Sequence, residues 1–266
     1  MGKSRFSISD LAPSAPLTEA ATVRLLESCW DRDKKGDDYK DVDWRKEWQN
    51  LQALGSRFLA AADGPDDGGV EWHHLLVGVG NFKRQSPIGV GVTIPSAAPP
   101  SRDSFTIPTR GQTVAMTSKV DPGNRQEPEM WRALTSIPGV GVPTATAILA
   151  ALWRGEHFIF DRRVRFAVIG LVCGPKWASD PTLDGKSLPL NQDWELYAWA
   201  RKCLRKSASS KDKLLALERG LYVLDLWTMK SIADSKEPNG WTWREYADRA
   251  REILSKRAKS PGETTP

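Results

Sequence analysis

The sequence predicts a mostly α-helical protein, and two observations on the pattern of apolar and β-branched residues lead to this prediction. Apolar residues recur at steps of three and four along most of the chain, which is the spacing of one helix face. Short β-branched runs gather in one segment, residues 86–125. The chain has 266 residues, 40% of them hydrophobic, and can therefore bury a sizeable core.

The N-terminal region, residues 1–85, is expected to contain three helices. Helical spacing covers residues 17–30, and after a charged stretch a second apolar face follows, made of Trp44, Trp48, Leu51, Leu54 and Phe58. The Gly- and Asp-rich run at 62–69 is a clear break. A third helix is expected at 71–82.

Residues 86–125 form a region rich in Pro, Gly, Ser and Thr. We expect an irregular connection there, with room for a small β-hairpin. Helical spacing returns over residues 126–259, where the predicted helices are 127–136, 143–153, 162–171, 191–206, 211–230 and 241–257. The polar tail, residues 260–266, is expected to be disordered.

Composition narrows the class of protein. A net charge of +5 permits a polyanionic partner without establishing one. Cys29, Cys173 and Cys203 are too scattered for a disulfide framework, and the adjacent His73 and His74 lack further ligands for a metal site. The chain opens without a secretion signal and has no apolar run long enough to span a membrane. A soluble cytoplasmic protein is therefore expected.

The most informative stretch is residues 134–152 (LTSIPGVGVPTATAILAAL). Residues 138–141 (PGVG) predict a tight turn, and Pro143 suits the first turn of the next helix. That helix has a face of small residues, at Ala145, Ala147, Ala150 and Ala151, which lets another helix approach closely.

The two glycines of this turn leave backbone N–H groups bare at a helix N-terminus. Hydrogen bonds and the helix dipole attract phosphate to such a place, without reading base sequence. A mere tight turn is the alternative for any short Gly-x-Gly. The full pattern instead predicts contacts with double-stranded DNA through Gly139, Val140, Gly141, Val142 and Thr144.

The segment Ile137–Val168 (IPGVGVPTATAILAALWRGEHFIFDRRVRFAV) resembles the helix-hairpin-helix base-excision DNA glycosylases. Locally it is most similar to the MutY-type adenine glycosylases, and more widely it is similar to bacterial proteins with an 8-oxoguanine DNA glycosylase fold. The resemblance implies two helical lobes with a DNA-binding cleft between them.

In that family an Asp begins the helix after the hairpin, and the matching residue here is Asp161, 18 residues after Pro143. A carboxylate there can stabilise the oxocarbenium-like state and orient a water molecule. Capping of the helix is the alternative role, and both can hold together. Arg162 and Arg163 could contact phosphates, keep Asp161 ionised, or be solvated surface residues.

The sequence departs from the family at Pro143, where the bifunctional members carry a nucleophilic lysine. Proline cannot form a Schiff base, so the resemblance implies a monofunctional enzyme. The four cysteines of the family's iron–sulfur cluster are absent. No cofactor is therefore expected, although hairpin carbonyls could hold a cation.

These features together predict a DNA N-glycosylase of base excision repair that flips out and removes a modified or mispaired purine. The alternative is a non-catalytic DNA-binding or modified-nucleotide-sensing protein of a bacterial antiviral defence system. A second basic cluster is expected to be a solvated face; its members are Arg201, Lys202, Arg205, Lys206, Lys211 and Lys213.

Overall fold

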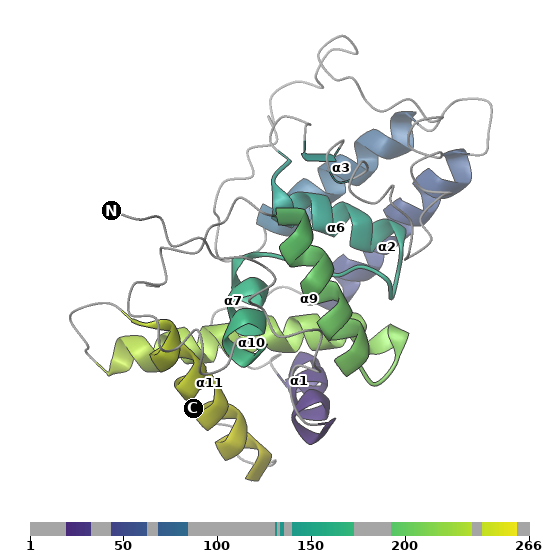
Figure 1. Ribbon diagram of the computed structural model, residues 1–266. Coiled ribbons are helices and arrows are strands. Elements are labelled where there is room, and N and C mark those ends of the chain that lie inside the picture. The colour runs from purple at the N-terminus through teal and green to yellow at the C-terminus, as the bar shows by residue number, and fades with distance from the viewer. Residues whose placement is uncertain are drawn as a thin grey trace, which may run out of the picture. The chain divides into compact units, whose positions relative to one another are not determined.

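The structure is a computed structural model that describes residues 20–32, 44–62, 69–84, 131, 134–135, 140–172, 193–235 and 241–259. These residues contain eight α-helices and no β-strand (Figure 1), which confirms the mostly helical prediction. The expected connection at 86–125, most of the predicted helix 127–136 and the tail 260–266 lie outside the described residues.

The chain divides into two compact units that do not follow the order of the sequence. Unit 1 comprises Met1–Lys34 and Phe160–Pro266, and unit 2 comprises Lys35–Ile159. Each unit therefore has its own core. The two candidate functional features, the hairpin helix and Asp161, lie in different units. The hairpin helix belongs to unit 2 and Asp161 belongs to unit 1.

Unit 2 contains α2 (Trp44–Ala62), α3 (Gly69–Arg84) and α6 (Val142–Leu152), and α6 packs against the other two (Figure 1). Aromatic pairs join α2 to α3: the ring centroids of Phe58 and Trp72 are 5.1 Å apart, and those of Trp48 and Phe82 are 5.8 Å apart. Of the face predicted for α2, the side chains of Trp48, Leu51 and Phe58 are buried.

Helix α6 is buried along almost its whole length, from Thr144 to Leu152. Its alanine face allows the close approach that the sequence predicted. Gly55 of α2 lies so near α6 that an added Cβ would collide with the main-chain carbonyl of Ala151. Two backbones thus meet directly, and both sides of the contact need small residues.

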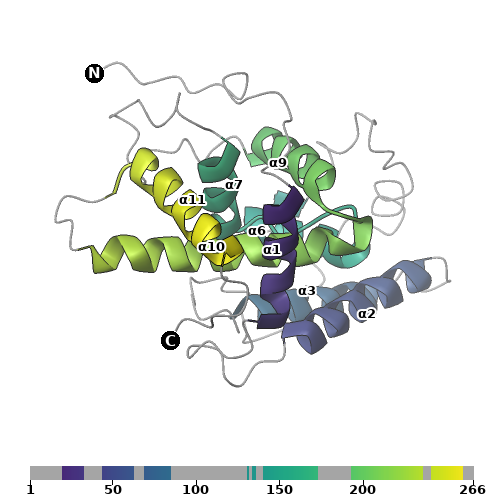
Figure 2. The same ribbon diagram turned by 90° about the horizontal axis from the view of Figure 1, so that it is seen from below.

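Unit 1 is built around the long helix α10 (Leu214–Asp234), with α1 (Ala20–Arg32) and α7 (Arg162–Val172) on opposite sides of it (Figures 1 and 2). Helix α11 (Trp243–Lys259) packs against both α10 and α7. The backbones of α1 and α10 are in close contact, since a Cβ on Gly220 would collide with the carbonyl of Leu26.

Helix α9 (Asp193–Ser207) leads to α10 through a short 3₁₀ turn, η4 (Lys211–Lys213). The predicted helix 211–230 is therefore wrong at its start: the α-helix begins at Leu214, because the N–H of Lys213 bonds the carbonyl of Ser210 and winds this segment more tightly. Across the described ranges, no helix is both long and apolar enough to cross a membrane.

Candidate nucleic-acid interface and catalytic carboxylate

The N-terminus of α6 has no side chain to cap it. Gly141 precedes the helix in an extended conformation (φ −85°, ψ 179°), and its carbonyl accepts the N–H groups of Thr144 at 3.0 Å and Ala145 at 2.9 Å. Pro143 lies in the first turn, as predicted, where its missing N–H costs nothing. The positive end of the helix dipole is therefore not neutralised by any residue of this helix.

Among the residues that the structure describes, none requires position 141 to be glycine. Its φ is in the ordinary range, and the one described atom that an added Cβ would meet is the Cδ of Pro143 at 3.8 Å, an ordinary contact. Gly141 is also exposed. A glycine at such a position leaves the main chain open to close approach by another group.

The other predicted hairpin contacts differ in their surroundings. Gly139 lies outside the described residues. The side chain of Val140 is buried and that of Val142 is half-buried. Thr144 is 0% exposed, and its Oγ1 is buried without a hydrogen-bond partner in the part of the chain that the structure describes. Its N–H already bonds Gly141, so Thr144 offers no exposed polar group to a ligand.

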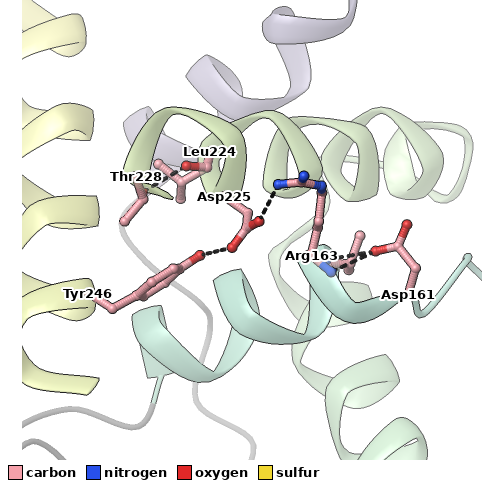
Figure 3. A network of polar contacts seen from close by, with 7 residues as sticks. Asp161, Arg163, Leu224, Asp225, Thr228 and Tyr246 are labelled. Atoms are coloured by element: carbon pink, nitrogen blue, oxygen red, sulfur yellow. Dashed lines mark hydrogen bonds and ion pairs between the residues drawn. The ribbon is translucent and has the colours of Figure 1, made fainter. Parts of the chain in front are cut away.

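Asp161 caps the N-terminus of α7 (Figure 3). Its Oδ1 accepts the backbone N–H groups of Arg163 at 2.9 Å and Val164 at 3.0 Å, and its carbonyl accepts the N–H of Arg165 at 3.0 Å. The residue is half-buried. Capping is thus confirmed as one role of Asp161, and its carboxylate is held in one orientation by two donors and the helix dipole.

The guanidinium of Arg163 is paired inside unit 1. Its Nη1 lies 2.8 Å from Oδ2 of Asp225 on α10, and its Cζ lies 5.5 Å from the ring centroid of Tyr222. The side chain is 21% exposed. Arg163 therefore meets Asp161 through its backbone N–H, while its charge faces a carboxylate that the sequence did not point out.

Asp225 is a buried acid held from two sides (Figure 3). While Oδ2 faces Arg163, Oδ1 accepts the hydroxyl of Tyr246 at 2.7 Å. Burial raises the pKa of Asp225 to about 6; the Tyr246 hydrogen bond and the Arg163 charge oppose this rise, and the charge of Asp161 adds to it. Burial and the Asp225 charge raise the pKa of Tyr246 well above its usual value.

Asp225 and Tyr246 were missed from the sequence. The available signal was a lone acid inside the apolar run of α10, at LYVLDLW. A buried acid needs a cation or a donor beside it, so this position indicates that a partner exists without saying which. The partners come from helices 62 and 21 residues away in sequence.

The remaining basic residues lie mostly at the surface. Arg162 is exposed, with its guanidinium 5.0 Å from the ring centroid of Phe166. In the second basic cluster Lys202, Lys206, Lys211 and Lys213 are exposed, as predicted. The prediction is wrong for Arg201, which is 6% exposed and lies 6.0 Å from the ring centroid of Trp194, because it is on the inner face of α9.

No protein-family model, no curated protein and no solved structure matches this chain. The candidate site therefore depends on its own geometry and on the residues of the hairpin segment.

Proposed function

We propose that this chain is a monofunctional DNA N-glycosylase that removes a modified or mispaired purine from double-stranded DNA, with Asp161 as its catalytic carboxylate. The observation that carries the proposal is the state of Asp161: a half-buried carboxylate held by two backbone N–H groups, 18 residues after Pro143. A preoriented carboxylate stabilises developing positive charge without reorganising during the reaction.

The reaction follows from that charge. Lengthening the bond between the base and C1′ of the sugar leaves positive charge on the sugar, which the Asp161 carboxylate stabilises. Water then supplies the hydroxyl that bonds C1′ and the proton that the departing base takes up. Water is thus the only co-reactant that hydrolysis needs. The Schiff-base chemistry by which a lysine also cuts the DNA strand is not part of this reaction, and Pro143 could not perform it.

DNA contacts are proposed at the open N-terminus of α6 and at Arg162. Gly141 and Val142, with Gly139 and Val140 before them, would present main-chain groups to a phosphate. Thr144 and Arg163 are left out of the proposed contacts. The first is fully buried, and the second already pairs with the carboxylate of Asp225.

One observation favours the second candidate, a DNA-binding or modified-nucleotide-sensing protein without catalysis. The cap that Asp161 provides for α7 is by itself a sufficient reason for an Asp at this position. Under this alternative the hairpin still binds DNA, and Asp161 only stabilises a helix. Neighbouring genes for antiviral defence would indicate a defence role, and neighbouring genes for DNA repair would indicate a repair role.

A glycosylase screen tests the proposal directly. Duplexes that carry different purine lesions and mispairs are incubated with the protein, and each sample is divided for treatment with or without alkali. We expect strand breaks only after alkali, which reveals abasic sites. Binding without base release on every duplex would favour the second candidate, and absence of both would refute the two together.

Borohydride trapping tests the monofunctional character. With Pro143 in place of a nucleophile, no covalent protein–DNA adduct should be trapped during turnover. A trapped adduct would move the chemistry to another lysine.

A further inference from the structure

The first turn of α7 is tied to two other helices through one carboxylate. Arg163, two residues after Asp161, reaches α10 at Asp225. Tyr246 of α11 reaches the other oxygen of the same carboxylate. Figure 3 shows the chain of contacts running from Asp161 through Arg163 and Asp225 to Tyr246.

The position of Tyr246 is itself set by α7. A Cβ added to Gly170 would lie 2.6 Å from both Cδ1 and Cε1 of the Tyr246 ring, so the absence of a side chain at Gly170 admits that ring. Arg163 thus joins one end of α7 to α10, and Gly170 lets α11 pack near the other end. Contacts with Asp225 and packing at Gly170 thus fix the positions of α7, α10 and α11 relative to one another.

Stability alone does not account for this arrangement. The side chain of Asp225 is 3% exposed, and burial raises its pKa even though Arg163 and Tyr246 oppose the change. Ionisation of Asp225 at neutral pH therefore makes the fold less stable than it is with the protonated acid. Buried ion pairs of this kind can often be replaced by apolar side chains of similar volume without loss of stability.

We propose that Arg163 and Asp225 are positioning residues for Asp161. Their ion pair, completed by Tyr246, fixes the first turn of α7 on α10 and thereby sets the direction of the capping carboxylate. The inference rests on the proposed function of Asp161. It assigns Arg163 an internal role in place of a contact with DNA.

The test replaces the whole polar group by apolar residues, in the variant Arg163→Met/Asp225→Leu/Tyr246→Phe. Its melting temperature should equal or exceed that of the wild type, while single-turnover base release slows by about tenfold to a hundredfold, because a small misplacement of a reacting group is enough. DNA affinity should not change. A role in stability alone would lower the melting temperature and leave the rate of the folded protein intact.

The matched control is Arg249→Gln/Glu252→Gln, which removes an exposed ion pair of α11 whose nitrogen and oxygen are 3.0 Å apart. It should behave as wild type in every measurement. Base release by the triple variant at the wild-type rate would overturn the inference.

A second measurement does not depend on activity or on the triple variant. In Asp225→Asn, hydrogen exchange should quicken at the amides of Arg163 and Val164, which bond Asp161, relative to amides elsewhere in α10 and α11. Unchanged exchange at those two amides would overturn the inference even if the triple variant failed to fold. Wild-type protein that releases no base would refute the proposed function instead, and the exchange data would still decide the positioning role.

Discussion

Helices α6 and α7 begin in opposite ways. The N-terminus of α6 follows an exposed glycine and has no side-chain cap, whereas that of α7 is closed by Asp161, whose Oδ1 accepts two backbone N–H groups. Both helices have 11 residues, so their dipoles are of similar length. The difference lies in where the negative charge comes from.

An open N-terminus needs an anion from outside, while a capped one supplies its own. The first arrangement suits a phosphate that binds and leaves. The second holds a carboxylate in place whether or not a ligand is present. Within the proposed glycosylase, α6 would therefore serve binding and α7 would serve chemistry. Variants of Asp161 and Gly141 can separate the two, and a third experiment tests the buried ion pair behind the start of α7.

The largest effect is expected at Asp161. Asp161→Asn keeps an oxygen that can accept both N–H bonds, and Asn and Asp are similar N-caps, so melting temperature and DNA affinity should stay nearly unchanged. Base release should fall by about 10²–10³-fold, since the charge that stabilises the sugar cation is gone. Single-turnover base release beside thermal melting measures both.

Asp161→Ala is the companion variant, because it removes cap and charge together and should destabilise by about 1 kcal/mol. Base release by Asp161→Asn at the wild-type rate would mean that Asp161 is only a cap of α7.

A smaller effect, on stability, is expected when Asp225 ionises as the pH rises. Its pKa is raised from 3.8 to about 6, so its contribution to stability is fully present below about pH 4 and is lost as pH rises through about 6. At about 1.4 kcal/mol per unit, the change is at most about 3 kcal/mol.

This loss of stability should appear in the free energy of unfolding, measured in urea from pH 4 to pH 8. The stability of Arg163→Met/Asp225→Leu/Tyr246→Phe relative to wild type should increase between pH 4 and pH 7 and then level off. A stability difference between the triple variant and the wild type that does not change with pH would mean that Asp225 has an ordinary pKa and that its ionisation does not lower stability.

The smallest effect is expected at Gly141, and it concerns mainly binding. The series Gly141→Ala and Gly141→Val adds bulk where the nearest described atom to a new Cβ is 3.8 Å away, so stability should fall only by the loss of a favourable N-cap residue, about 1 kcal/mol or less. DNA affinity should fall equally for all sequences. The slope of log K against log salt should flatten by about 0.9 for every phosphate that the variant no longer binds.

Gly55→Ala is the opposite case and serves as the control, because its Cβ would collide with the carbonyl of Ala151. It should lower stability by about 1–3 kcal/mol without changing the salt slope. Unchanged DNA affinity in Gly141→Val would exclude the α6 start as a phosphate site.

Most of the features that were predicted correctly depend on residues close together in the sequence. Apolar spacing located the described helices to within a few residues, and Pro143 marked the first turn of α6. Asp161 was recognised as a cap candidate because capping depends on the next three residues only. The alanine face of α6 predicted a close neighbour.

What escaped prediction depends on partners distant in sequence. Nothing in the chain assigns Gly55 to α6 or Asp225 to Arg163, because a helix pattern shows which face is buried and not what covers it. Arg163 looked like a surface cation for the same reason. The cleft inferred from the family resemblance and the role of Asp161 in catalysis remain predictions.

The contact between α1 and the segment before α10 also has a consequence for synthesis. Ser209 bonds Glu27 through both its N–H and its hydroxyl, across a separation of 182 residues. At roughly 5–20 residues per second on the ribosome, α1 waits on the order of 10–40 s for its neighbours to emerge. During that time the apolar side chains of α1, including Leu26, lack the α10 surface on which they pack in the folded protein.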